Sequence, residues 1–261
     1  MSKRTNEISK KQYALFVFLG LFSFFATWSV LSYSGLIKPF FLPSPSKVFS
    51  AIYRLFVSGE LVSDIFISIG RILLGFLVSL IVSLPLGIWL GISKRIEALC
   101  EPVIAFVRYI PPSAFVPLMI IWFGVGELEK VALLFLGIAP YLTLLIMDYI
   151  KNTRRDLIEV SRTLGANHWQ VIRKVILPGA MPGIWDSFRI MIGAAWTFVI
   201  IAEIIGASSG LGFIIIQSQR YLRTDNIFGV IIIIGVLGII TDYAFKWSYL
   251  KMFKWTEKAR N

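Results

Sequence analysis

The chain has 261 residues, of which 57% are hydrophobic and only 16% are charged, and its formal net charge is +11. Soluble domains carry about 25% charged residues, so this composition excludes an ordinary soluble protein and indicates an integral membrane protein. The basic residues stand between apolar runs, as in the loops of membrane proteins. We therefore expect a lipid bilayer, and no nucleic acid, as the partner of this charge.

Six apolar segments are predicted to cross the membrane, because each reaches the ~20 residues that a spanning helix needs. The first follows Lys10 and Lys11 as a signal peptide would, but its apolar run is too long for a signal core and no cleavage site is evident. The expected spans are Tyr13–Tyr33, Ile65–Ile92, Val103–Phe123, Val131–Ile150, Phe188–Ala207 and Ile227–Tyr249. The predicted fold is an all-α membrane protein, with a transmembrane domain over residues 13–250 between tails at 1–12 and 251–261.

Most of the 26 Lys and Arg residues fall on one side of these six spans. That side holds the N-terminal tail, the connection at Lys94 and Arg95, the long loop after Lys151 and the C-terminal end. The positive-inside rule makes it the cytoplasmic side. Because six spans return the chain to its starting side, we expect a multi-pass protein of the cytoplasmic (inner) membrane with both termini cytoplasmic.

Two connections on the opposite side are predicted to contain short helices. Phe41–Ser46 reads as a turn into an amphipathic surface helix, Lys47–Phe56. Ser208–Gly212 interrupts the chain after the fifth span, and Phe213–Leu222 is predicted to be a re-entrant or surface helix. Prolines within the spans are predicted to kink their helices: Pro85, Pro111, Pro112, Pro117 and Pro140.

The loop at residues 151–183 is the longest and carries a helix–glycine–helix pattern. Thr153, with Asp156 three residues later, is similar to a capping box and predicts a helix from about Arg154. Gly165 is predicted to end that helix in a left-handed conformation. Asn167 is predicted to cap a second helix, which Pro178 and Pro182 then stop.

Each helix of this loop has one apolar stripe, formed by Leu157, Val160 and Leu164 in the first and by Trp169 with Ile172 in the second. A hairpin that is apolar on one face and basic on the other can lie on lipid headgroups. It can equally dock a cytoplasmic partner, and the pattern alone leaves both interpretations open.

Ionisable groups at membrane depth are costly and therefore suggest function. Arg71 and Arg108 are expected either to line a pathway for an anion or to form structural pairs, and Glu203 is expected to pair with one of them. Aromatic side chains in the spans are expected either to line the pathway or to pack. The candidate pathway residues are Arg71, Arg108, Tyr109, Trp122, Trp196 and Glu203.

Cys100 and His168 are the only residues of their types. The sequence therefore has no intrachain disulfide, thiolate metal site or His-rich metal centre. It also lacks a Gly-x-x-x-x-Gly-Lys-Ser/Thr phosphate loop. We expect no metal or cofactor on this chain. A membrane-embedded enzyme would need clustered catalytic side chains, and a secondary transporter is favoured by internal symmetry, which is not apparent.

Glu159-Val-Ser-Arg-Thr-Leu-Gly165, followed after nine residues by Val175-Ile-Leu-Pro178, resembles the cytoplasmic signature of binding-protein-dependent ABC importer permeases. That signature runs Glu-Ala-Ala, three residues, Gly, nine residues, then Ile-x-Leu-Pro; Val160, Ser161 and Val175 depart from it by small or apolar exchanges. Segments throughout the chain look like the nitrate/sulfonate/taurine/bicarbonate branch of these permeases: Leu42–Pro45, Ser68–Gly75, Pro111–Pro117 and Ala202–Gly212.

The resemblance implies a type I ABC importer permease in which the loop is a coupling helix seated on a nucleotide-binding subunit. The implied coupling residues are Glu159, Arg162, Leu164, Gly165, Ala166, Trp169 and Pro178. It also implies a second permease chain, most simply an identical one, two ATP-binding subunits that hold ATP and magnesium, and an extracytoplasmic solute-binding protein. The implied cargo is a small anion such as nitrate, a sulfonate, taurine or bicarbonate, with a vitamin or vitamin precursor as the alternative.

Overall fold

The computed structural model describes residues 9–256, and every regular element within that range is helical. The elements in chain order are α1 (Lys10–Tyr33), α2 (Pro45–Val57), α3 (Glu60–Ile92), α4 (Lys94–Arg108), α5 (Pro112–Phe123), α6 (Glu127–Lys151), α7 (Arg155–Thr163), α8 (His168–Val171), the π-helical segment η1 (Ile172–Ile176), α9 (Leu177–Ile204), α10 (Leu211–Arg220) and α11 (Thr224–Met252). The all-α prediction is confirmed. Of the predicted tails, residues 1–8 and 257–261 lie outside the described range.

Within residues 9–256, five helical stretches are long and apolar enough to cross a membrane. They are α1, α3, α6, the continuous stretch His168–Ile204 and α11. α4 and α5 make a sixth candidate as a pair bent by 96°. The six predicted spans are therefore present only if this bent pair is counted as one. The two short surface helices are also present, as α2 and α10.

The kink predicted at Pro111 and Pro112 is confirmed and is sharp: within the span predicted over Val103–Phe123, α4 ends at Arg108, α5 begins at Pro112, and the two helices are bent by 96°. Consecutive prolines explain the break: Pro111 has no N–H and disfavours the helical conformation of Ile110 before it. Pro112 then suits the first position of the new helix. The other prolines predicted to kink helices, at positions 85, 117 and 140, lie inside helices that continue past them.

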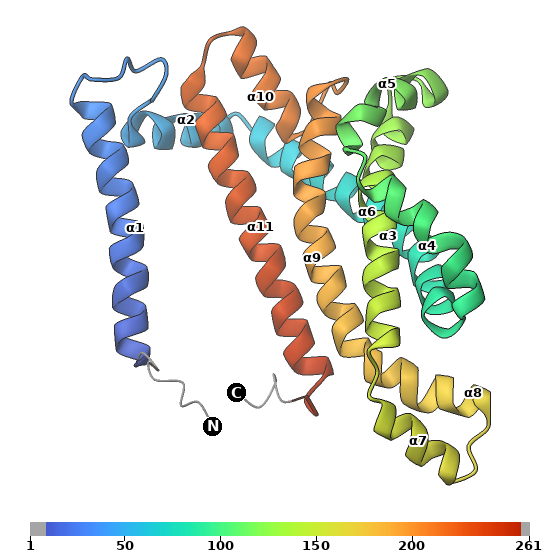
Figure 1. Cartoon of the computed structure of the whole chain (residues 1–261). Helices are drawn as coiled ribbons and strands as arrows, with labels where there is room; N and C mark the ends of the chain where they lie inside the picture. Colours follow the sequence, from blue (N-terminus) through green and yellow to red (C-terminus); the bar gives the residue numbers. More distant parts are fainter. Residues whose placement is uncertain (1–8, 257–261) are drawn as a thin grey trace.

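The core of the molecule is formed by three long helices: α6 packs against both α3 and α9, and α3 runs obliquely behind the other two (Figure 1). Leu134, Ile138, Leu142 and Ile146 of α6 are fully buried there. Small residues permit the close approach: a Cβ at Gly75 of α3 would lie only 2.5 Å from the Cβ of Leu134. Without a hydrophobic force between helices in lipid, such close backbone packing is a main source of helix association.

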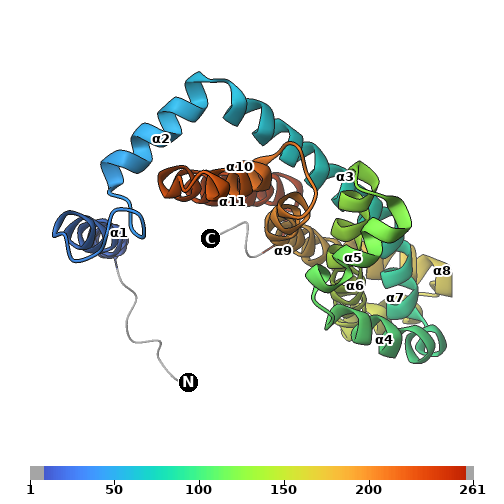
Figure 2. The same ribbon diagram turned by 90° about the horizontal axis from the view of Figure 1, so that it is seen from above.

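α1 stands apart from this core, and among the described helices its closest neighbour is α2 (Figures 1 and 2). Only 6% of the residues in its apolar membrane-spanning stretch are buried. The end of α1 next to α2 is fixed by Trp28, whose indole N–H donates to the carbonyl of Pro43 at 3.0 Å. The remaining apolar surface of α1 is thus available to lipid or to another chain.

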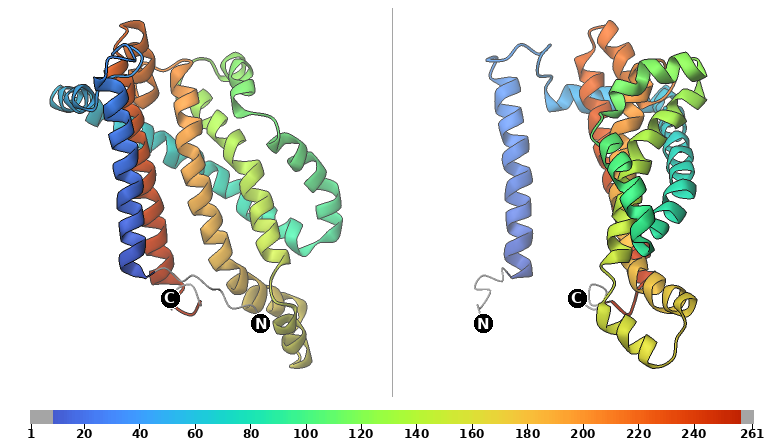
Figure 3. Two further views of the ribbon diagram at one scale, coloured as in Figure 1. Left: turned by 60° about the vertical axis from the view of Figure 1, so that its left-hand side comes forward. Right: turned by 45° about the vertical axis from the view of Figure 1, so that its right-hand side comes forward.

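The helix ends fall on two opposite sides of the molecule. The start of α1, the end of α11 and the α7–α8 turn lie at one end, whereas α2, α5 and α10 lie at the other (Figures 1 and 3). This separation agrees with the alternation of loops on which the charge argument rests. We call the end that carries α2, α5 and α10 the outer end, following that argument.

Candidate functional site

The α7–α8 hairpin projects from the end of the molecule opposite α2, α5 and α10 (Figure 3). α6 leads into it after Lys151, and η1 joins α8 to α9 without a break in the helix. The turn between α7 and α8 depends on Gly165, whose φ of +83° disfavours any residue with a side chain. The hairpin is therefore held at both ends by long membrane helices.

The predicted cap of the second hairpin helix is confirmed. The Asn167 side chain accepts from the N–H of Gln170 at 2.9 Å, and the Gln170 side chain accepts from the N–H of Asn167 at the same distance. This reciprocal pair is a capping box. It fixes the start of α8 directly after the glycine turn.

Two other local predictions for this loop are wrong. Thr153 does not cap α7, because its hydroxyl donates back to the carbonyl of Tyr149, and Arg154 stands at the N-cap without a side-chain cap. Arg154 instead pairs with Asp156, and this hydrogen bond lowers the pKa of the Asp156 carboxyl.

Pro178 and Pro182 do not stop the second helix. Pro178 directly follows η1 in a helix that runs without a break from His168, and this helix continues past Pro182 to Ile204. The wider π-helical turn of η1 directly precedes them. The fifth span consequently begins well before Phe188, and α9 joins the hairpin directly.

The tip of the hairpin exposes large apolar side chains. Leu164 is 82% exposed and Trp169 is 74% exposed. Beside them lies a hollow of about 380 Å³, lined by residues that include Gly165 and Ala166. Glu159, Arg162 and Pro178 are exposed as well, and neither Glu159 nor Arg162 forms an ion pair within residues 9–256. An apolar surface with charged neighbours is typical of a protein–protein docking site.

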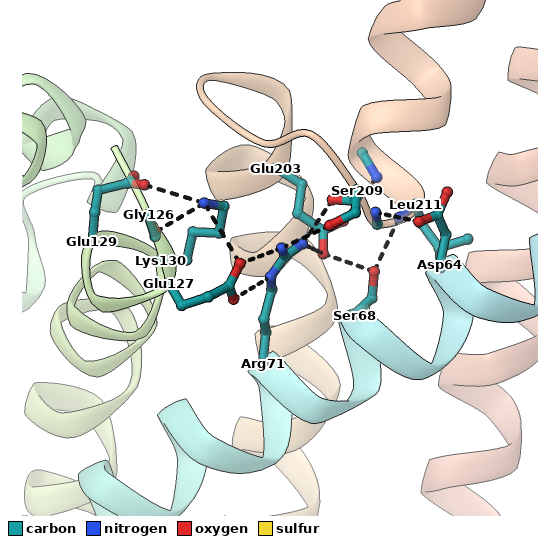
Figure 4. Close-up of polar contacts among 12 residues, drawn as sticks. Asp64, Ser68, Arg71, Gly126, Glu127, Glu129, Lys130, Glu203, Ser209 and Leu211 are labelled. Atoms are coloured by element: carbon teal, nitrogen blue, oxygen red, sulfur yellow. Dashed lines mark hydrogen bonds and ion pairs between the residues drawn. The ribbon is translucent and has the colours of Figure 1, made fainter. Parts of the chain in front are cut away.

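At the outer end, the buried side chain of Arg71 in α3 is the centre of a polar cluster (Figure 4). Its Nε and Nη2 donate to the two carboxylate oxygens of Glu127 at 2.7 and 2.6 Å, and its Nη1 donates to Glu203 at 2.8 Å. Nη1 and Nη2 also donate to the carbonyl and hydroxyl of Ser209. These contacts use all five N–H groups of the guanidinium. We call Asp64, Ser68, Arg71, Glu127, Glu203 and Ser209 the Arg71 cluster.

The same cluster fixes the chain between α9 and α10. The N–H groups of Gly210, Leu211 and Gly212 donate to Asp64, Ser68 and Glu203, at 2.7, 3.0 and 2.8 Å. Ser68 in turn donates to Glu203 at 2.7 Å. The unpaired N–H groups at the start of α10 are thus satisfied by side chains from α3 and α9.

A second charged pair adjoins the cluster at the start of α6. The Lys130 ammonium donates to the carbonyl of Gly126 at 2.8 Å and lies 3.7 Å from the fully buried carboxylate of Glu129. It also lies 4.0 Å from Glu127 (Figure 4). The start of α6 therefore carries two carboxylates that face two cations.

The structure brings together only some of the predicted pathway residues. Glu203 pairs with Arg71 and not with Arg108. Arg108 and Tyr109 lie at the break between α4 and α5, where Nη2 of Arg108 donates to the Tyr109 hydroxyl at 3.1 Å and the buried Nε has no hydrogen-bond partner among the described residues. Trp122 is exposed near the end of α5.

Trp196 is buried in the core, and its indole N–H donates to Thr241 of α11. The six residues therefore form two separate pairs and two isolated tryptophans, one exposed and one buried. Their role in a pathway stays a prediction.

Sequence reasoning did not identify Glu127 as a partner of Arg71. The predicted spans place Glu127 in the connection between Phe123 and Val131. A pattern on α3 was available: Asp64, Ser68, Arg71 and Gly75 recur at helical spacing and share one face. The pattern indicates a polar face on α3 but carries no information on which distant carboxylate meets it.

A family profile described as the binding-protein-dependent transport system inner membrane component matches residues 83–254. The chain is 36% identical over 230 residues to a putative aliphatic sulfonates transport permease protein of Bacillus subtilis, covering 88% of this chain and 83% of the relative. It is 31% identical to the taurine transport system permease protein of Escherichia coli, covering 87% and 85%.

A chain from the structure of a methionine ABC transporter in inward-facing conformations is similar in fold. The TM-score is 0.67 at 20% identity, and the match covers 74% of this chain and 96% of the other.

Proposed function

The chain belongs to the family of binding-protein-dependent transport system inner membrane components, and we propose that it forms the translocation pathway of an ABC importer for a small organic sulfonate. It is a multi-pass membrane permease and not an enzyme. In this proposal the solute arrives on a separate binding protein at the outer end, and partner ATPase chains bind ATP and magnesium at the opposite, cytoplasmic end. Both termini then lie in the cytoplasm of a cell with the chain in its inner membrane.

One observation carries the proposal: the α7–α8 hairpin is continuous with α6 and α9 and exposes an unpartnered apolar tip. Leu164 and Trp169 supply the apolar contact, while Glu159 and Arg162 supply charges for pairing. A rigid knob of this kind can transmit the closure of an ATPase pair to the membrane helices. The family signature covers the same residues, which supports the ATPase as the occupant.

The cargo class rests on the relatives and on Arg108. Two relatives carry sulfonate or taurine in their names. Arg108 has an unpartnered Nε–H and no carboxylate partner within the described residues, and it stands where the helix is broken. A guanidinium with unused donors suits a planar or tetrahedral oxyanion. We place the solute contact of this chain at Arg108 and Tyr109.

A second copy of the chain completes the pathway in this proposal. The broken helix α4–α5 with exposed Trp122, and the largely uncovered α1 at the opposite edge of the molecule, leave apolar surface that a partner chain can cover. An identical partner would enclose the pathway between the two chains.

The proposal is tested by uptake with Arg108→Gln in proteoliposomes that contain the ATPase and the binding protein. A hydrogen bond to a charged group contributes about 1.5–3 kcal/mol, so sulfonate uptake should fall about tenfold or more. Arg95→Gln removes the same charge from the other end of α4 and should leave uptake unchanged. Nitrate, bicarbonate and an uncharged vitamin precursor serve as competing solutes. Normal sulfonate uptake by Arg108→Gln, or preferred uptake of the uncharged solute, would contradict the proposal.

A further inference from the structure

Arg71 joins the outer ends of the same two helices whose inner ends carry the hairpin. α6 begins at Glu127 and leads into α7, and α9 follows α8 and η1 and reaches Glu203 in its last turn. One guanidinium holds both carboxylates, at 2.6 Å from Glu127 and 2.8 Å from Glu203 (Figure 4). The hairpin and the Arg71 cluster therefore close α6 and α9 into a frame that is tied at both ends.

The long sides of this frame are also packed together along the membrane. Near the inner end, a Cβ at Gly183 of α9 would overlap the ring of Tyr149 of α6. Midway, a Cβ at Gly137 of α6 would lie 2.7 Å from the ring of Phe198 of α9. Apolar contact thus holds the inner and middle parts, whereas an ion-pair cluster holds the outer part.

All N–H groups of the Arg71 guanidinium are used in hydrogen bonds, whereas the Nε–H of Arg108 has no partner among the described residues. Arg71 is 3% exposed, and its five N–H groups all donate to groups of this chain. No N–H remains for a solute. Two carboxylates face its positive charge, and the Lys130 ammonium lies 4.0 Å from the Glu127 carboxylate.

We propose that Arg71 is a positioning residue that ties the outer ends of α6 and α9 to α3, so that these helices and the hairpin move as one body during transport. Shear of α6 against α9 at the outer end would break two short charge-assisted bonds, which have a fixed fork geometry. The proposal rests on the proposed function, since it assigns the hairpin its mechanical role.

The α9–α10 turn belongs to this body. Because Asp64, Ser68 and Glu203 hold the N–H groups at Gly210, Leu211 and Gly212, the outer turn follows α3 and α9 when they move. A displacement of this outer turn is therefore transmitted to the hairpin through helices and side chains that are in direct contact. Arg71 contacts both ends of this route, because it donates to Ser209 in the turn and to Glu127 at the start of α6.

Glu127→Gln is the variant that tests the tie. The Glu127 side chain is 64% exposed, and Glu203 remains to balance Arg71, so the variant should fold and insert. Stimulation of ATPase activity by the loaded binding protein should fall about tenfold, within the range typical for coupling between sites. Retention of the ATPase should be unchanged. Asp225→Asn is the matched control, because it breaks an outer ion pair of 2.8 Å with Arg54 that touches neither α6 nor α9.

A second measurement reads the tie without any partner protein. Spin labels replace Leu128 of α6 and Ile205 after α9, both exposed, in a chain whose single cysteine, Cys100, is changed to Ala. The distance distribution between the labels should be narrow with Glu127 and with Asp225→Asn, and broad with Glu127→Gln. This readout holds even if the ATPase assignment fails, so the two proposals are tested separately.

Two results would overturn the inference. One is an unchanged distance distribution in Glu127→Gln, which by itself would show that Arg71 does not tie α6 to α9. The other is a lower KM for solute with normal stimulation, which would mean that the freed N–H groups of Arg71 bind the anion.

Discussion

At the scale of single residues, burial and pairing distinguish groups that look alike in the sequence. Arg71 and Arg108 were equal candidates for a pathway, yet one is enclosed by carboxylates and the other has an unused buried N–H. The pairing of Glu203 could not be predicted, because it depends on how α3 and α9 pack in space. The ionisable character of these positions, in contrast, was readable from the sequence alone.

The Arg71 cluster gives a prediction at residue scale for Gly210. This glycine has φ +105°, and a Cβ there would overlap the Glu203 carboxylate and lie 2.6 Å from Nη1 of Arg71. Gly210→Ala should therefore destabilise the protein by about 1–3 kcal/mol, measured by thermal unfolding in detergent. Gly193→Ala is the control, since a Cβ there meets nothing within 4 Å. Equal stability of the two variants would show that the outer turn is not held as described.

At the scale of elements, apolar length predicted where helices cross the membrane but not how they join. α1, α6 and α11 match their predicted spans to within a few residues. Prolines show the difference most clearly. Pro111 and Pro112 bend their span by 96°, as their predicted kink indicates, whereas Pro178 and Pro182, which were predicted to stop a helix, leave it intact. The effect of a proline depends on its place in the helical turn and on neighbouring geometry, such as η1, which sequence periodicity does not reveal.

The π-helical segment yields a prediction for the orientation of the hairpin. A π-helical turn holds one residue more than an α-helical turn, so deletion of Arg173 should convert Ile172–Ile176 to α-helix. The hairpin would then rotate by about 100° relative to α9. The ATPase should no longer co-purify, although the chain remains in the membrane. Arg173→Ala keeps the segment length and should retain the ATPase; if the deletion retains it as well, the orientation set by η1 does not matter.

At the scale of the whole molecule, the charge pattern and the helix ends lead to one orientation. The α7–α8 hairpin lies at the end of the molecule opposite α2, α5 and α10. Cysteines introduced at Ser58 and Leu222 in a Cys100→Ala chain should react with an impermeant maleimide in intact spheroplasts. A cysteine at Trp169 should react only after permeabilisation. Reaction at Trp169 from outside would reverse the orientation and remove the basis for a cytoplasmic ATPase.

The central claim is that the hairpin couples this permease to an ATPase, and Gly165 offers the sharpest test. Gly165 and Gly59 have nearly equal φ values, +83° and +80°, and a Cβ at either meets nothing within 4 Å. Valine should strain either site by about 1–2 kcal/mol, but only Gly165 lies at the docking tip.

The decisive measurement pairs ATPase retention with ATPase stimulation by the loaded binding protein in reconstituted membranes, for Gly165→Val against Gly59→Val. We predict that both variants insert normally, that Gly59→Val behaves as the unmodified chain, and that Gly165→Val loses about tenfold in retention or stimulation. Normal retention and normal stimulation in Gly165→Val would contradict the coupling role of the hairpin.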